Sequence, residues 1–131
     1  MIRGCLKLLP TQIDEVSLAT IGKEASAMLM RRDFSGLAER FGYALSFDRS
    51  TGMAIEEDYL RAVESPSRAR AASVVKVDVK FFAPNDTGLF AVVECLVPTG
   101  DGAYINLELI VTGFGAEKFV TLEDINGGEL S

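Results

Sequence analysis

The sequence predicts an α+β fold in which N-terminal helices lie against a C-terminal antiparallel sheet of about four strands. Two observations carry this prediction. Up to about residue 64, apolar residues recur every three or four positions, which is typical of amphipathic helices. From about residue 71 to residue 125, apolar and polar residues alternate, and three turn signals divide this half into strand-length pieces. Helices followed by a strand meander belong to the α+β class.

The N-terminal half predicts three helices. The first begins at Thr11, and Asp14 and Glu15 place negative charge in its first turn, where the positive end of the helix dipole stabilises it. Asp33 is the expected N-cap of the second helix. Residues 43–47 fit either an extended link or a short strand, both remain open, and the connectivity of residues 43–51 is not assigned. The expected helices span residues 11–30, 33–41 and 52–64.

The C-terminal half predicts four strands joined by short turns, which make neighbouring strands antiparallel. If the hairpins close without bulges, Asp78, Glu94 and Glu108 share one face near one level. The opposite, helix-facing side is almost wholly apolar. Gly113 and Gly115 are expected at a bulge or a sharp bend. The expected strands span residues 74–82, 89–97, 104–112 and 118–125.

Length and composition indicate one domain over residues 1–131. Apolar residues make up 48% of the 131-residue chain and charged residues 24%, which are ordinary globular values. No apolar run approaches the ~20 residues that span a bilayer, and the N-terminus lacks a secretory pattern, so we expect a cytoplasmic protein without a membrane partner. The net charge of −6 disfavours nucleic acid. The basic run at residues 61–76 is best explained as a solvated connection.

Several site chemistries are excluded or disfavoured. The chain has no histidine, so a Ser-His-Asp site, a His–Asp dyad and a histidine-containing metal site are all impossible. Cys5 and Cys95 lack companion ligands and are interpreted as structural or free thiols. Asp78, Glu94 and Glu108 form a possible cation cluster, but lysines on the same face favour cross-strand charge pairs. We therefore expect no metal and no cofactor.

The order of the elements resembles the NTF2-like (cystatin-like, cone-shaped) superfamily. The resemblance rests on the long helix ending near Met30, the short helix at 33–41 followed by Gly42-Tyr43, the third helix, and the four strands. It implies a bent sheet that wraps the helices into a cone, often with a small apolar ligand at the open end. It also implies that dimers through the outer face of the sheet are frequent. Enzymes of this superfamily, isomerases and dehydratases, place Asp, Tyr or His side chains inside the cone.

A cavity of this kind would draw its polar groups from tyrosines and from helix or loop acids. Because histidine is absent, proton chemistry would need a carboxylate base and a tyrosine donor. Tyrosines are more often core or rim residues than catalytic donors, so no catalytic residue is assigned. The cavity candidates are Tyr43, Tyr59, Tyr104, Asp48 and Asp58.

The outward face of the sheet is the candidate assembly surface. Apolar side chains exposed at the centre of a sheet mark an interface, which predicts a homodimer. The interface candidates are Phe90, Val92, Glu94, Leu96, Asp78 and Glu108. The leading hypothesis is a small non-enzymatic binding or accessory protein with a cavity for an apolar ligand or a surface for a partner protein. The alternative is a small isomerase- or dehydratase-like enzyme that uses a carboxylate and a tyrosine.

Overall fold

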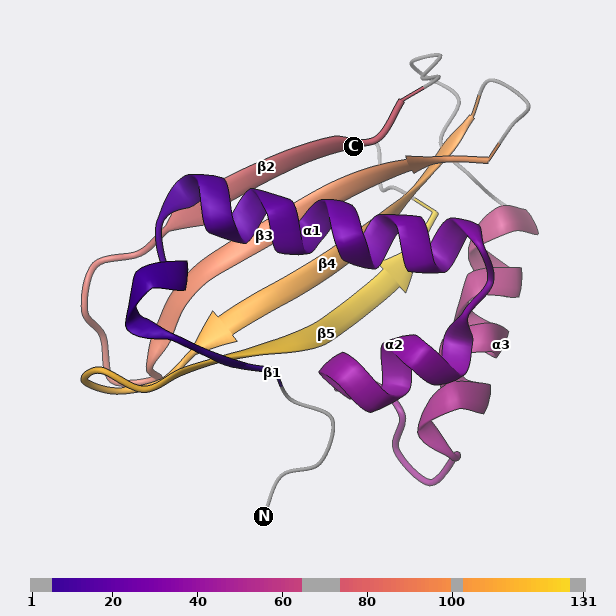
Figure 1. The fold of residues 1–131 in the computed structure, drawn as a ribbon. Coiled ribbons are helices and arrows are strands. Elements are labelled where there is room, and N and C mark those ends of the chain that lie inside the picture. The colour runs from indigo at the N-terminus through magenta and orange to yellow at the C-terminus, as the bar shows by residue number, and fades with distance from the viewer. Residues whose placement is uncertain (1–5, 65–73, 100–102, 128–131) are drawn as a thin grey trace.

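The computed structural model describes residues 6–64, 74–99 and 103–127. Cys5 and most of the basic run lie outside these ranges. In the described chain, helices pack on an antiparallel sheet, which confirms the α+β class (Figure 1). The elements are β1 (Leu6–Leu8), the 3-10 turn η1 (Pro10–Gln12), α1 (Glu15–Met30), α2 (Phe34–Phe41), α3 (Thr51–Glu64), β2 (Lys76–Phe81), β3 (Leu89–Pro98), β4 (Tyr104–Thr112) and β5 (Lys118–Asn126).

The sheet has five strands, so the expectation of about four is corrected. Its order is β1-β5-β4-β3-β2 and all neighbours are antiparallel. The additional strand is β1, which pairs Leu6 with Val120 and Leu8 with Lys118 along β5. A three-residue strand carries too little alternation to be recognised in the sequence. The other four strands lie close to their predicted ranges.

The helices also follow the prediction, with one shift. Residues Pro10–Gln12 form the separate turn η1, so α1 begins at Glu15 with Asp14 as its N-cap, and not at Thr11. The N-cap of α2 is Asp33, as predicted, and its Oδ1 accepts a hydrogen bond of 3.0 Å from the Gly36 N–H. Residues 43–50 form no strand; they make turns between α2 and α3.

The helices share the inner face of the sheet. Helix α1 packs on β2 and β3, whereas α2 and α3 pack against β5 (Figure 1). A Cβ at Gly22 would lie 2.8 Å from Cγ1 of Val93, so glycine at this position permits α1 to lie so close to β3. Every second residue of β3 faces this layer and is buried; these residues are Ala91, Val93, Cys95 and Val97. The inner side of the sheet is therefore filled core.

The outer face of the sheet is only partly buried. Asp78 pairs with Glu94 and Glu94 with Glu108, which confirms the predicted alignment, and Asp124 extends the row on β5. Phe90 does not follow the alternation. It lies at a β-bulge between Leu89 and Ala91 and packs against the buried cluster, because a bulge changes the side to which a residue points.

Candidate functional site

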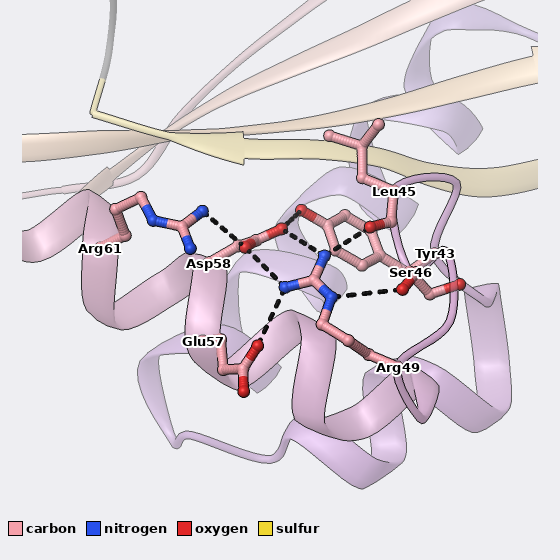
Figure 2. A network of polar contacts seen from close by, with 7 residues as sticks. All are labelled: Tyr43, Leu45, Ser46, Arg49, Glu57, Asp58 and Arg61. Atoms are coloured by element: carbon pink, nitrogen blue, oxygen red, sulfur yellow. Dashed lines mark hydrogen bonds and ion pairs between the residues drawn. The ribbon is translucent and has the colours of Figure 1, made fainter.

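Two of the predicted cavity residues meet where α3 packs beside the 43–50 link. Tyr43 follows the end of α2, and Asp58 lies in the middle of α3 (Figure 2). The Tyr43 hydroxyl donates a hydrogen bond of 2.5 Å to Oδ2 of Asp58. Both side chains are buried. The structure thus brings a carboxylate and a tyrosine together, which is the pair that the enzyme hypothesis requires.

Two arginines occupy the remaining positions around this carboxylate (Figure 2). Arg49 places Nη1 3.1 Å from Oδ1 and Nη2 3.4 Å from Oδ2 of Asp58, and Arg61 places Nη1 3.1 Å from Oδ1. Arg49 is itself held by hydrogen bonds to the carbonyl oxygens of Leu45 and Ser46. Each oxygen of Asp58 therefore accepts two hydrogen bonds, so the buried charge is fully compensated.

The electrostatics of the pair oppose proton transfer near neutral pH. Burial raises the pKa of Asp58, but the hydrogen bonds from Arg49 and Tyr43 outweigh it and hold the pKa below its usual value. Burial and the neighbouring Asp58 carboxylate raise the pKa of Tyr43 far above its usual value. The acid thus remains ionised and the phenol remains protonated, whereas a general base is most effective with a pKa near the working pH.

The other three cavity candidates lie apart from this pair. Tyr59 is half-buried on α3, where its ring packs 5.5 Å from Phe34 and lines a hollow of about 200 Å³. Tyr104 is buried at the start of β4, opposite Pro98, and Asp48 is exposed in the link. Within the described chain, no hydrogen bond, ion pair or ring contact joins these three residues to Tyr43 or Asp58.

Sequence reasoning missed the two arginines that compensate Asp58. Arg61 lies three positions after Asp58 on the same helix, a spacing at which opposite charges meet, so this contact carried a local signal. Arg49 carried none, because its approach depends on how the link folds back over α3.

The outer face of the sheet is the second candidate site. Val92 pairs with Ile110 across β3 and β4, which gives an apolar centre beside the acidic row. Nζ of Lys80 lies 3.5 Å from Oε1 of Glu94, which is a cross-strand ion pair of the kind expected for the lysines on this face. Burial and the adjacent Glu94 and Asp124 raise the pKa of Glu108. In the part of the chain that the structure describes, no three potential ligands are grouped so as to hold a metal ion.

Comparison with known proteins gives no match, since no family model fits the chain and no curated protein or solved structure resembles it significantly. Among the described helices, none combines the length and the apolar character needed to cross a bilayer.

Proposed function

We propose that this chain is a small, non-enzymatic binding or accessory protein of NTF2-like fold that assembles as a homodimer through the outer face of its sheet. The observation that carries the proposal is the difference between the two faces of β3. Residues on the inner face are buried in the core, whereas Val92, Glu94 and Leu96 on the outer face remain half-exposed. An interior already filled with side chains favours a surface function over a large enclosed cavity.

The charges of the outer face favour one arrangement of the two copies. Lysines 76 and 80 lie on β2, at one edge of the face, and Glu123 and Asp124 lie on β5, towards the other. A two-fold axis parallel to the strands would set β2 of one copy opposite β5 of the other, and the reverse contact would repeat by symmetry. Asp78 would then face Asp124 of the second copy, with Lys76 and Lys80 flanking that contact on either side along the strands, and the apolar pair Val92 and Ile110 would lie near the centre.

Light scattering and native mass spectrometry of the full chain over a range of concentrations test this dimer. We expect Val92→Lys to raise the dissociation constant about tenfold or more, because it places a charge in the apolar centre. Val16→Lys is the matched control, since Val16 is 73% exposed on α1. A wild-type chain that remains monomeric at every concentration would overturn the proposal.

A charge exchange tests the orientation of the dimer separately. Lys80→Glu should weaken association, and the addition of Asp124→Lys should restore it if β2 faces β5 of the second copy. If the wild type is a dimer but the double variant is as weak as Lys80→Glu alone, the copies meet in another orientation. A dimer that Val92→Lys leaves intact uses another surface.

The alternative, an isomerase- or dehydratase-like enzyme, depends on Tyr43 and Asp58. Their contact is the geometry that such chemistry needs, but each oxygen of Asp58 is taken by two donors and its pKa is lowered. Neither residue lines the hollows described in this structure. We therefore assign the pair to stability. A pH-dependent isomerase activity lost in Tyr43→Phe, while the variant remains folded, would favour the enzyme.

A further inference from the structure

A hollow of about 320 Å³ lies at one end of the sheet, between the β2–β3 turn and the β4–β5 turn. Figure 1 shows both turns at the same end of the sheet. The volume is near the lower limit of small-molecule sites, which start at roughly 300 Å³. We call it the turn hollow, and its lining includes Phe82, Gly88, Phe90, Gly113, Phe114 and Lys118.

The walls of the turn hollow are held by local hydrogen bonds. Asn85 donates to the carbonyl oxygens of Ala83 and Leu89, and its Oδ1 accepts from the Thr87 and Leu89 N–H groups. The Gly113 N–H donates to the Gly88 carbonyl over 2.9 Å and so joins the two turns. Positive φ angles at Gly88 and Gly113 make both bends possible. A ligand would thus meet a largely formed site.

The lining is mostly aromatic. Phe82 and Phe114 are unusually exposed for large apolar residues, at 43% and 69%. Phe90 lies deeper and contacts the core. Such rings, open to solvent around a hollow, favour a flat or short apolar body over a sugar or a peptide backbone.

Lys118 gives the turn hollow a buried positive charge. This residue is 8% exposed, and its ammonium donates to the Gly115 carbonyl and lies 5.1 Å from the centre of the Phe90 ring. Within the described residues, no carboxylate lies within ion-pair distance of it. A buried charge is normally paired, so an ammonium with one carbonyl and one ring retains donors for an anion.

We propose that the turn hollow binds a small carboxylic acid with a flat or short apolar body, whose carboxylate pairs with Lys118. A single ammonium matches a monoanionic head group, whereas a phosphate dianion would need further cations or donors. The phenylalanines cover the apolar body. This site goes beyond the proposed dimer surface, because its lysine lies on the inner side of β5, in line with Val120 and Leu122.

The test compares two probes that differ in charge. We would titrate 1-naphthoate and its neutral analogue 1-naphthylmethanol into the isotope-labelled full chain, and follow the amide signals of Gly88, Gly113 and Gly115 by NMR. We expect saturable shifts with 1-naphthoate and about tenfold weaker binding of the alcohol, the effect of one charge-assisted contact. No saturable shift at these glycines, or equal affinity of the two probes, would overturn the proposal.

Substitutions identify the lysine that is responsible. Lys118→Met should bind 1-naphthoate no better than 1-naphthylmethanol, and Lys118→Arg should keep part of the discrimination. Lys7→Met is the matched control, because Lys7 lies on the adjacent strand with a side chain 61% exposed. Equal discrimination in Lys118→Met and wild type would overturn the assignment. If Lys118→Met does not fold, the two probes on wild type and Lys118→Arg still decide. The measurements of self-association do not depend on this titration, so the proposed dimer and the proposed ligand site can be refuted independently.

Discussion

Asp58 and Lys118 are the two charged side chains that are buried in the described chain, and their surroundings differ. Asp58 is 7% exposed, and two arginines and a tyrosine compensate its charge. Lys118 is 8% exposed and has one carbonyl oxygen and one aromatic ring. The two charged groups are therefore buried to the same extent, but neighbouring groups compensate the charge of Asp58 much more fully than that of Lys118. The carboxylate of Asp58 links elements of the fold through its hydrogen bonds, whereas the ammonium of Lys118 keeps hydrogen-bond donors available for a ligand.

The Asp58 network and the surroundings of Lys118 also differ in the role that we assign to them. The Asp58 network connects α3 to the link after α2, and none of its residues lines the turn hollow. Lys118 lines the turn hollow, where aromatic rings remain open to solvent. If this distinction is correct, substitutions at Asp58 should change folding stability, and substitutions at Lys118 should change ligand binding.

The largest effect is expected from Asp58→Ala. The change leaves Arg49 without its main partner and removes the acceptor of the buried Tyr43 hydroxyl, so we expect a loss of about 3 kcal/mol in the free energy of unfolding. Urea denaturation at fixed protein concentration measures it. Glu57→Ala, which removes only the exposed ion pair to Arg49, is the control and should cost about 0.5 kcal/mol or less. A small effect at Asp58 would contradict the structural assignment.

Tyr43→Phe should have the next largest effect. It removes one hydrogen bond to a charged group while keeping the ring, so a loss of about 1.5 kcal/mol is expected. The same denaturation measurement applies. The double variant Tyr43→Phe with Asp58→Asn should lose less than the sum of the two single changes, because both act on one network. Strict additivity would show that the pair is not coupled.

Lys118→Met, in contrast to Asp58→Ala, should not lower the free energy of unfolding substantially. Methionine keeps an unbranched apolar stem, and removal of an uncompensated buried ammonium relieves its desolvation, so we expect unfolding free energy within about 1 kcal/mol of wild type or above it. Thermal and urea denaturation measure it without ligand. A loss as large as that of Asp58→Ala would show that Lys118 stabilises the fold and would remove the contrast.

The strand pattern made most of the sheet predictable from the sequence. Alternation alone placed Asp78, Glu94 and Glu108 in one row, because the pleat repeats every second residue. The same rule places Lys118 on the side of Val120, so the alternation of β5 also indicates a lysine on the inner face. Phe90 was placed on the wrong face because a bulge adds a residue without changing the pattern.

The Asp58 network was predictable only in part. Tyr43 and Asp58 were both candidates on chemical grounds, but their contact depends on how the link between α2 and α3 turns, and residues 43–51 carried no clear periodicity. Arg49 lies in the same link. Contacts between a link and a helix are fixed by tertiary packing, so no local pattern could identify them.

The smallest expected effect concerns Glu108, whose environment is the opposite of that of Asp58. Its pKa is raised above the ordinary 4.5 by burial and by neighbouring acids, so its ionised form destabilises the fold. This destabilisation is fully present above the raised pKa of Glu108 and disappears as the pH falls to the ordinary pKa of 4.5. Glu108→Gln should therefore gain about 0.5 kcal/mol of unfolding free energy at pH 7, a modest figure because the group is partly exposed, and little at pH 4.

For Asp58, whose pKa is lowered from 3.8, the sign is reversed. Its stabilisation is full above that ordinary value and is lost as the pH falls through the lowered pKa, so Asp58→Asn should approach wild type only in acid. Denaturation of wild type and both variants between pH 2 and pH 7 separates the two cases, with Glu39→Gln as an exposed control on α2. If Glu108→Gln loses stability at pH 7, the acidic row is compensated within the monomer. The outer face would then carry no excess of acid for a second copy to balance, and lysine-to-acid contacts would no longer explain the orientation of the proposed dimer.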